Sequence, residues 1–343
     1  MGSHGRSTVL AILAVCLLAL AGVAAGPADA APAAEPAPPQ IAYVDVAVAT
    51  LWTEPGLDRP IDAPAVGNPV DPRRWTDDQT VAQRLWLVGK LETQALYGQR
   101  VTVLERSGDW VHVAVAGQPT PRNDQGYPGW MTAAQLTTNP AFAGKTGRPF
   151  ALVTAKTTGL YADPARKHHS MSLSIDTRLP MLGRNGHSIK VFTPDRGAAW
   201  ISGDDAQVYT SPSDIPRPTP ADLASTARHF AGLPYVWAGT SAWGFDCSGF
   251  THTVYDVHGI TIPRDAGDQF AAGRPVPEDA MQPGDLIFYA YASGYIHHVG
   301  IYLGDGWEAD APNNTPGVVS RLEIVRVGEQ RYADQYAGSR RFL

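Results

Sequence analysis

Apolar and polar residues alternate along two long stretches of the chain, and each stretch ends in a segment that contains tryptophan. In the first stretch the alternating segments are AYVDVAVATLW (42–52), RVTVLERSGDWVHVAVAG (100–117) and GYPGWM (126–131). In the second they are FALVTAKTTGLYAD (150–163) and TRLPMLGRNGHSIKVFTPDRGAAWIS (177–202). A period of two residues, broken by Gly-Asp or Pro-Gly, is typical of short β-strands joined by tight turns. The sequence therefore predicts two small β-barrels in tandem, over residues 41–143 and 147–211.

A proline-rich segment follows the second barrel. SPSDIPRPTP (211–220) holds four prolines in ten residues, which excludes a helix or a central strand. We interpret residues 212–218 as a linker. Thr219 then has the position of a helix N-cap, with Pro220 as the first helical residue.

The pattern after this linker mixes helical and strand periods. In FTHTVYDV (250–257) the apolar residues recur at helical spacing, so a helix should begin at about Cys247. Strand patterns return in PGDLIFYA (283–290) and HHVGIYLGDGWEAD (297–310). Residues 219–343 should therefore form a domain of the α+β class.

The N-terminus has the plan of a secretory signal peptide. The apolar run STVLAILAVCLLALAGVAAG follows Arg6 and leads to a cleavage motif at Ala28-Asp29-Ala30. We predict that residues 1–30 are removed, that the Pro/Ala-rich residues 31–40 form an extended linker, and that the protein is secreted and cell-wall associated, without stable membrane insertion. A transmembrane anchor and a lipid on Cys16 are the alternative interpretations.

Composition narrows the kind of partner. The 343 residues carry a net charge of −6 and no long basic run, with 44% hydrophobic and 17% charged residues. These values are typical of folded domains and argue against nucleic acid and anionic membranes as partners. Small molecules, peptides and glycans remain as candidate partners.

Cysteine is nearly absent, which draws attention to GFDCSGF (244–250). The chain has two cysteines, Cys16 in the predicted signal peptide and Cys247 in this motif. A single mature thiol cannot form an internal disulfide. At a helix start the helix dipole favours the thiolate, and the pKa of a thiol, about 8.5 when free, can fall to roughly 3.5–7.5. We therefore predict that Cys247 is a nucleophile, with the flanking glycines permitting close approach of a substrate.

A thiolate nucleophile needs a base, and strand parity indicates one. Val299, Ile301 and Leu303 share one face of the predicted strand, which places His298 on the other, toward a surface or cleft. If Gly304-Asp305-Gly306 forms a three-residue turn, Asp310 lies on the same face as His298 and can orient the imidazole. Cys247, His298 and Asp310 then form a Cys–His–carboxylate triad.

The motifs of this domain resemble those of NlpC-type peptidases, a papain-like family of bacterial cell-wall cysteine peptidases. The resemblance is carried by PYVWAGTSAWGFDCSGF, IPRDAGDQF, QPGDLIFY and HHVGIYLGDG. The barrels resemble bacterial SH3-like domains, as in three-domain members that are γ-D-glutamyl-L-diamino acid endopeptidases. The implied fold is two all-β SH3-like barrels followed by a papain-like domain. The family implies Cys247 as nucleophile and His298 as base and acid, and its third position, most often His, falls on Asp310.

The resemblance also implies a substrate site for peptidoglycan stem peptides that begin with a free L-Ala. The implied substrate-side residues of the catalytic domain are Tyr235, Asp246, Ser248 and Asp265. Glu92 and Tyr127 are the implied contributions of the first barrel, which would wall the L-Ala end of the cleft. A substrate ammonium favours such carboxylates and phenols. Ala266 stands where relatives carry a hydroxyl, and Arg264 has two open roles, as partner of Asp246 or Asp265 or as ligand of a substrate carboxylate.

Other interpretations stay open. Asp310 and Glu92 could be ordinary surface carboxylates, and Tyr127 could be a packing residue of the barrel. His168-His169 and His297-His298 lack zinc spacing, so neither a metal site nor a cofactor is predicted. The chain could be mainly a wall-binding protein whose SH3-like domains contact glycan, with a silent catalytic domain. Acyl transfer or amidase chemistry on the same thiol scaffold is a further alternative.

Overall fold

The computed structural model describes residues 40–343. The predicted signal peptide and all but the last residue of the predicted linker lie outside the described residues. Within 40–343, no helix is both long enough and apolar enough to cross a membrane. The same part of the chain has no group of three or more His, Cys, Asp or Glu side chains arranged to hold a metal ion.

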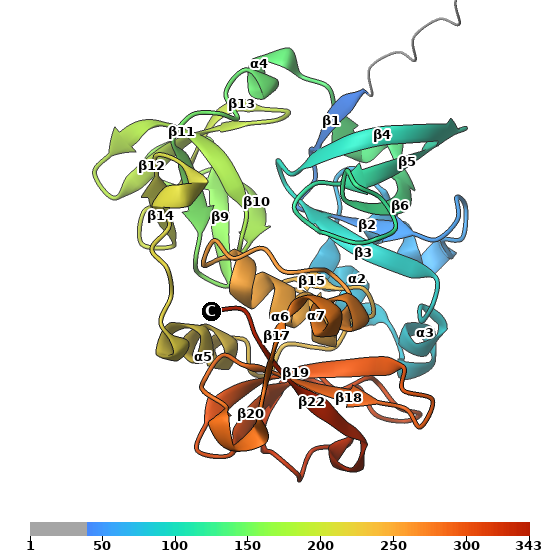
Figure 1. The fold of residues 1–343 in the computed structure, drawn as a ribbon. Helices are drawn as coiled ribbons and strands as arrows, with labels where there is room; N and C mark the ends of the chain where they lie inside the picture. The colour runs from blue at the N-terminus through green and yellow to red at the C-terminus, as the bar shows by residue number, and fades with distance from the viewer. Residues whose placement is uncertain (1–39) are drawn as a thin grey trace, which may run out of the picture. The chain divides into compact units, whose positions relative to one another are not determined.

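The first β domain is a seven-stranded antiparallel sheet (Figure 1). Its strands are β1 (Ile41–Val44), β2 (Val48–Trp52), β3 (Leu91–Leu96), β4 (Arg100–Ser107), β5 (Trp110–Val115), β6 (Tyr127–Thr132) and β7 (Leu136–Thr137). The spatial order is β3-β2-β6-β5-β4-β1-β7. The segment between β2 and β3 carries a 3₁₀ turn at Pro60–Asp62 and the helices α1 (Ala63–Val66), α2 (Pro72–Asp78) and α3 (Val81–Trp86).

The second β domain repeats this topology. Its strands are β8 (Phe150–Val153), β9 (Thr157–Tyr161), β10 (His169–Ser174), β11 (Arg178–Asn185), β12 (Ser188–Thr193), β13 (Gly197–Ser202) and β14 (Ala206–Tyr209). Their order is β10-β9-β13-β12-β11-β8-β14, which matches the first sheet strand for strand. The short helix α4 (Pro140–Ala143) joins the two sheets. The expected strands around Trp130 and Trp200 are present as β6 and β13.

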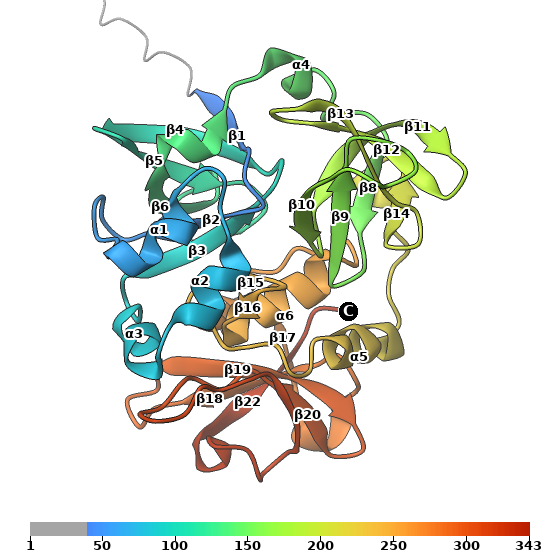
Figure 2. The same cartoon turned by 180° about the vertical axis from the view of Figure 1, so that it is seen from behind.

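The third domain packs helices on a six-stranded antiparallel sheet (Figures 1 and 2). Its helices are α5 (Pro220–His229), α6 (Cys247–Asp256) and α7 (Ala266–Ala272). The sheet strands are β17 (Arg274–Val276), β18 (Leu286–Ala290), β19 (Ile296–Gly304), β20 (Trp307–Asp310), β21 (Glu323–Arg326) and β22 (Tyr336–Arg341), in the order β17-β22-β18-β19-β20-β21. A small hairpin, β15 (Thr240–Ser241) with β16 (Gly244–Phe245), leads into α6.

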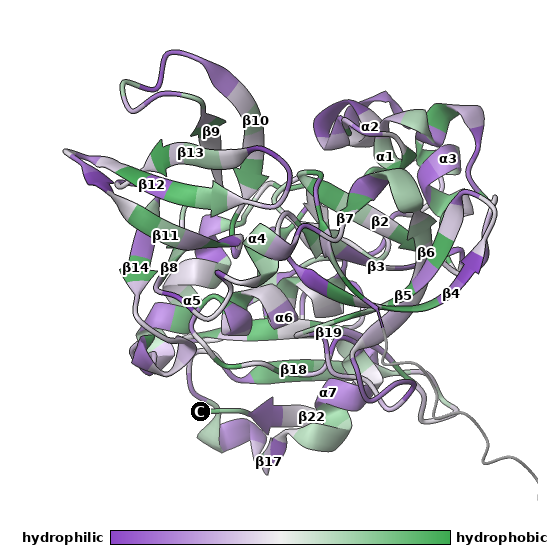
Figure 3. Ribbon diagram, turned by 90° about the horizontal axis from the view of Figure 1, so that it is seen from above, coloured by the Kyte–Doolittle hydropathy of each residue, from purple (hydrophilic) through white to green (hydrophobic). Residues whose placement is uncertain are grey.

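Local sequence signals explain where the helices begin. Thr219 caps α5: its hydroxyl accepts from the backbone N–H of Asp222, and the Asp222 carboxylate accepts from the backbone N–H of Thr219 at 2.8 Å. Helices α5, α6 and α7 all contact β19, an interior strand of the sheet. In Figure 3, β18 and β19 carry green, hydrophobic stretches beneath these helices. Burial of this sheet face therefore fixes α6, and with it Cys247, against the strand that carries His298.

Candidate active site

Cys247 is the first residue of α6, as the sequence predicted. Asp246 is the N-cap, and its Oδ1 accepts a hydrogen bond from the Gly249 backbone N–H at 2.6 Å. Cys247 is 7% exposed and carries a free thiol. The backbone amides of the first helical turn have no intrahelical backbone partner, and the helix dipole places partial positive charge at this end. This end of α6 can therefore bind and stabilise negative charge.

The two glycines of the cysteine motif serve the protein's own packing. A Cβ at Gly249 would lie 2.1 Å from the Gly239 carbonyl oxygen, and one at Gly244 would lie 2.3 Å from Val236 Cγ2. Such contacts would force the backbone apart. The expectation that these glycines admit a substrate is therefore wrong for both positions, because the close approach is made by the segment 236–239.

His298 faces Cys247 and is held by Asp310. Its Nε2 lies 2.5 Å from Asp310 Oδ1, and its buried Nδ1 has no hydrogen-bond partner within residues 40–343. Burial alone would lower the pKa of His298, but the neighbouring Asp310 and Cys247 side chains outweigh it and raise the pKa well above its usual value. The imidazole is thus stabilised in its charged form between a carboxylate and a thiol.

A β-bulge brings Asp310 onto the correct face. The turn contains two residues, Asp305 and Gly306, with φ of 53° and 76°, and not the three that the sequence suggested. Gly304 pairs with Trp307, but the register then shifts so that Ile301 pairs with Ala309. The bulge at Leu303 adds one unpaired residue to β19, which restores the register that a three-residue turn would have given. Without it, Asp310 would stand opposite Ile301 and point into the core.

His298 is more deeply buried than expected. The sequence placed it toward a surface or cleft, whereas its exposed fraction is 0%. The ring of Tyr332 lies 4.4 Å from the imidazole centroid and that of Tyr289 lies 5.8 Å away. Tyr332 comes from the segment after β21 and also contributes to the raised pKa of Tyr235. Sequence reasoning missed it, because no local pattern connects residue 332 with the catalytic strand.

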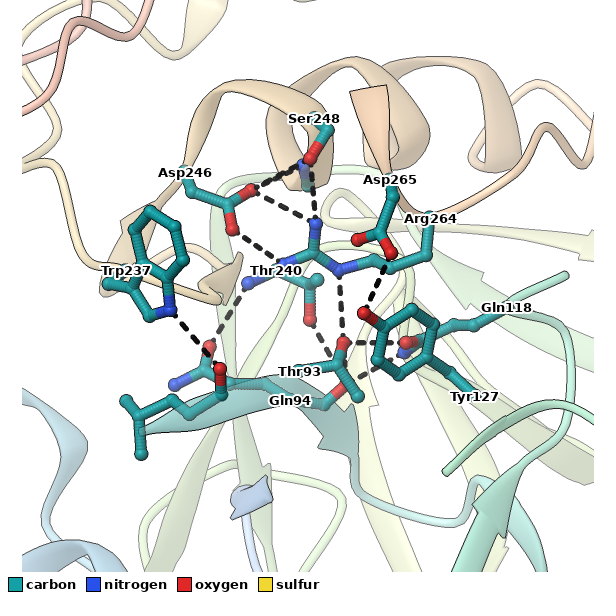
Figure 4. Close-up of polar contacts among 12 residues, drawn as sticks. Thr93, Gln94, Gln118, Tyr127, Trp237, Thr240, Asp246, Ser248, Arg264 and Asp265 are labelled. Atoms are coloured by element: carbon teal, nitrogen blue, oxygen red, sulfur yellow. Dashed lines mark hydrogen bonds and ion pairs between the residues drawn. The ribbon is translucent and has the colours of Figure 1, made fainter. Parts of the chain in front are cut away.

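Arg264 has a buried partner. It is 1% exposed and forms two hydrogen bonds with Asp246, at 2.8 and 3.1 Å. It also donates to Ser248 Oγ at 3.0 Å and, across domains, to Thr93 Oγ1 of β3 at 3.0 Å (Figure 4). The open choice for Arg264 is thereby settled in favour of Asp246. Both Asp246 and Ser248, two of the predicted substrate residues, are engaged in this network.

Tyr127 and Glu92 lie beside the same network. The Tyr127 hydroxyl donates to Asp265 Oδ2 at 2.8 Å (Figure 4). Glu92 forms a bidentate ion pair with Arg122, at 2.6 and 2.8 Å, and Arg122 also donates to the Tyr127 hydroxyl at 3.2 Å. Burial, more than any charge, raises the pKa of Asp265. Arg122 was not identified from the sequence, because it lies in an irregular loop whose path only the fold defines.

Tyr235 lies next to the thiol. It is 2% exposed, and burial, followed by the charges of Cys247 and Asp246, raises its pKa well above the usual value. The phenol therefore stays neutral and keeps its O–H as a hydrogen-bond donor near Cys247. Ala266, the first residue of α7, is buried beside Asp265 and supplies no polar group.

Comparison with known proteins identifies the family. A family model described as the NlpC/P60 family matches residues 232–341. Two further models match the β domains, a bacterial dipeptidyl-peptidase Sh3 domain at 89–136 and a YKFC SH3b2 domain at 153–209. The chain belongs to the NlpC/P60 family, with two SH3b domains before the NlpC/P60 domain. The predicted fold class is confirmed.

Two relatives align with this chain over most of their own length. A Bacillus cereus protein named gamma-D-glutamyl-L-lysine dipeptidyl-peptidase is 51% identical over 306 residues, which is 88% of this chain and 91% of the relative. A Bacillus subtilis protein of the same name is 36% identical over 86% of this chain and 96% of the relative. The crystal structure of an NlpC/P60 family protein from Bacillus cereus superposes with a TM-score of 0.84 at 50% identity, covering 88% of this chain and 99% of that one.

Proposed function

We propose that this protein is an exported cysteine endopeptidase that cleaves the γ-D-glutamyl bond to the diamino acid in peptidoglycan stem peptides with a free N-terminal L-Ala. The observation that carries the proposal is the buried contact of 2.5 Å between His298 and Asp310, in the domain where Cys247 opens a helix. The relatives named gamma-D-glutamyl-L-lysine dipeptidyl-peptidase support this assignment of the cleaved bond. Peptidoglycan peptides are then the partners, and the SH3b domains are candidates for additional contact with wall glycan.

The triad supplies a nucleophile, a proton carrier and an orienting group. The Cys247 thiolate attacks the γ-carbonyl carbon of D-glutamate. His298, through Nδ1, protonates the departing amine of the diamino acid and then takes a proton from the water that hydrolyses the thioester. Asp310 holds Nε2, which leaves Nδ1 free for both transfers. The Cys247 backbone N–H and the neutral phenol of Tyr235 stabilise the oxyanion.

The L-Ala end of the site is formed by groups from two domains. Both Glu92 oxygens are bonded to Arg122, whereas the Asp265 carboxylate receives one hydrogen bond within residues 40–343, from Tyr127 to Oδ2. A substrate ammonium therefore meets Asp265 with a free oxygen and shares Glu92 with Arg122. Tyr127, which already touches Asp265, completes the contact. This arrangement favours Asp265 as the main ammonium partner and Glu92 as the second.

Digestion of a defined peptide set tests the proposal. The set contains L-Ala-γ-D-Glu-diamino acid peptides with a free amine, the same peptides N-acetylated, and peptides still joined to glycan through a lactyl amide. Mass spectrometry should show that the γ-D-glutamyl bond is cleaved in the free peptides much faster than in the blocked ones. Cys247→Ala should abolish cleavage, and Asp310→Ala should lower turnover by orders of magnitude without unfolding the protein. Full activity of Asp310→Ala would remove Asp310 from the mechanism.

The ammonium contact has its own test within this set. A charge-assisted hydrogen bond contributes about 1.5–3 kcal/mol, or roughly ten- to a hundredfold in kcat/KM. Asp265→Asn should lower kcat/KM for free peptides by about this factor, Glu92→Gln by less, and neither should change the slow cleavage of acetylated peptides. Equal cleavage of free and blocked peptides by the wild-type enzyme would overturn the selectivity for a free L-Ala.

A further inference from the structure

A second buried carboxyl group lies beside the triad and has no part in the mechanism described so far. Glu308 is 0% exposed and precedes Asp310 by two residues in β20. Because the side-chain period of a strand is two, Glu308 and Asp310 point to the same face, which is also the face of His298. Among residues 40–343, neither carboxyl group forms an ion pair with an arginine or a lysine, and His298 is the only basic partner of Asp310.

The backbone of the catalytic strand makes room for this group. A Cβ at Gly300 would lie 1.9 Å from Glu308 Oε1 and 2.8 Å from its Cδ. Any residue other than glycine at this position would force the Glu308 side chain to move from its present place. Gly300 lies two residues after His298 on the same face, so the space that holds Glu308 is built into the strand that carries the catalytic base.

Only one of the two carboxyl oxygens of Glu308 has a hydrogen-bond partner among the described residues. Its Oε2 accepts from the Tyr289 hydroxyl at 2.7 Å, and Tyr289 pairs with His298 in register. Its Oε1 is buried and has no partner among the described residues, and the same is true of Asp310 Oδ2. Two ionised carboxylates with two unpaired oxygens around a single imidazolium would be costly to bury. A proton on Glu308 Oε1 removes one of these two buried negative charges.

The surrounding charges support this assignment. Burial and, second, the negative charge of Asp310 raise the pKa of Glu308 to about 8, although Tyr289 and His298 act in the opposite direction. The titratable groups that face Glu308 or its neighbour Asp310 from the adjoining elements are Tyr289, His298, Tyr302, Asp310, Glu323 and Tyr332. None of them is a permanent cation.

We propose that Glu308 is a positioning residue of the thiol site. It is a buried acid that keeps its proton at neutral pH, so that Asp310 is the only buried carboxylate paired with His298, and its ionisation limits activity in the alkaline range. This role concerns the same site as the proposed function, and it rests on that function only where the test measures activity. When Glu308 loses its proton, a second negative charge beside Asp310 stabilises the imidazolium further. His298 then gives up its proton to the leaving amine less readily.

The test compares Glu308→Gln with wild type across pH 6 to 10. Glutamine keeps the shape and the acceptor for Tyr289 but cannot ionise. Wild-type kcat/KM should fall in a single step near pH 8, and Glu308→Gln should lack this step, so the ratio of activities at pH 9.5 and 7 should rise about tenfold or more. The matched control is Glu323→Gln, which removes an exposed carboxylate opposite Asp310 and should keep the wild-type step.

A readout without substrate separates this inference from the proposed function. A group whose pKa is raised by folding stabilises the protein at low pH, and that stability is lost as the pH rises through the folded-state value. The Tm of wild type should therefore fall between pH 6 and 9 more than that of Glu308→Gln. If wild type cleaves none of the peptides but this Tm difference is observed, the proposed function is refuted. The conclusion that Glu308 is a buried acid then still holds.

Three results would overturn the inference. The first is an unchanged alkaline step in Glu308→Gln. The second is a folded Glu308→Gln protein as inactive at pH 6.5 as at pH 9.5, which would mean that the ionised carboxylate is required. If Glu308→Gln does not fold, Tyr289→Phe replaces it: loss of the hydroxyl that stabilises the ionised form should move the alkaline step to higher pH. The third result is an alkaline step that stays at the wild-type pH in Tyr289→Phe.

Discussion

The two SH3b domains have the same strand order and differ in what they contribute to the site. Each sheet presents its third strand to the segment that leads into α6, the helix that begins at Cys247. In the first domain this strand is β3, whose Gln94 binds Thr240 and Ser241 through both side-chain and backbone oxygens. In the second it is β10, whose Ser174 hydroxyl accepts from the Ala242 N–H at 3.0 Å. A shared topology therefore gives a shared docking edge.

The charged contacts of the two domains are different. The first domain provides Thr93 to the buried Arg264 and Tyr127 to Asp265, both next to the thiol helix. The second provides Arg178, which binds Asp256 at the far end of that helix at 2.8 Å and remains 31% exposed. One domain thus reaches the reacting end of α6 and the other its C-terminal end. The fold determines that both domains dock, and individual side chains determine which one forms the site.

The largest effect should come from cutting the buried link of the first domain. Arg264→Met leaves the buried Asp246 carboxylate without its partner, and breaking a buried pair in this way costs about 3–5 kcal/mol. Arg178→Met, its counterpart at the second domain, should cost about 1–3 kcal/mol, because the Arg178 side chain is 31% exposed, against 1% for Arg264. Urea unfolding of both variants measures the difference. Equal losses would mean that the two docking edges are energetically equivalent.

A smaller effect should follow from removing one hydroxyl at the first domain. Tyr127→Phe deletes the donor to Asp265 and should lower kcat/KM for free L-Ala peptides about tenfold, the value of a single hydrogen bond of about 1.4 kcal/mol. The control is Tyr161→Phe in β9 of the second domain, which should leave kcat/KM unchanged. A similar loss in both variants would show that the first domain acts through general stability and not through the site.

The smallest effect concerns pH at the second domain. Burial and, next, the charge of Asp256 raise the pKa of Asp176 well above its usual value. The stability that comes with this proton is lost as the pH rises through the folded-state pKa. Asp176→Asn cannot ionise, and asparagine tolerates the positive φ of 67° found there. Asparagine also gives up the 3.1 Å ion pair with Arg178, so the test is the change with pH: the Tm of Asp176→Asn relative to wild type should rise by a few degrees between pH 6 and pH 9, about 1 kcal/mol.

Differential scanning calorimetry at both pH values measures this difference. Asp204→Asn, at a site that is 71% exposed in the same domain, is the control and should leave Tm unchanged at both. A constant difference between Asp176→Asn and wild type across this range would show that Asp176 does not titrate there.

The groups that could be predicted from sequence are those with a local signature. Cys247 follows from a helix start, and His298 and Asp310 follow from strand parity across a short turn. These signals depend on residues at most a dozen positions apart, where backbone geometry alone fixes the relation. Even so, the turn length was wrong, and the contact was correct because the bulge at Leu303 compensates.

The groups that sequence reasoning missed depend on tertiary packing. In the sequence, Glu308 looks like an ordinary polar position of a hairpin. The structure shows that Gly300 makes space for its side chain. Arg122 binds Glu92 across 30 positions, and Arg264 reaches Thr93 across 171. No periodic pattern spans such distances. The sequence could therefore suggest which side chains matter at the first domain, but not which partners they already have.

The bulge at Leu303 also restricts how this hairpin can change in evolution. A single-residue insertion or deletion between His298 and Asp310 reverses the facing of every later residue in the strand. It would turn Glu308 and Asp310 away from His298 and bring Ala309 in their place. Insertions and deletions that preserve the site must therefore come in pairs, or be absorbed by gain or loss of the bulge. Among active relatives that keep the bulge, the length of this hairpin should therefore vary in steps of two.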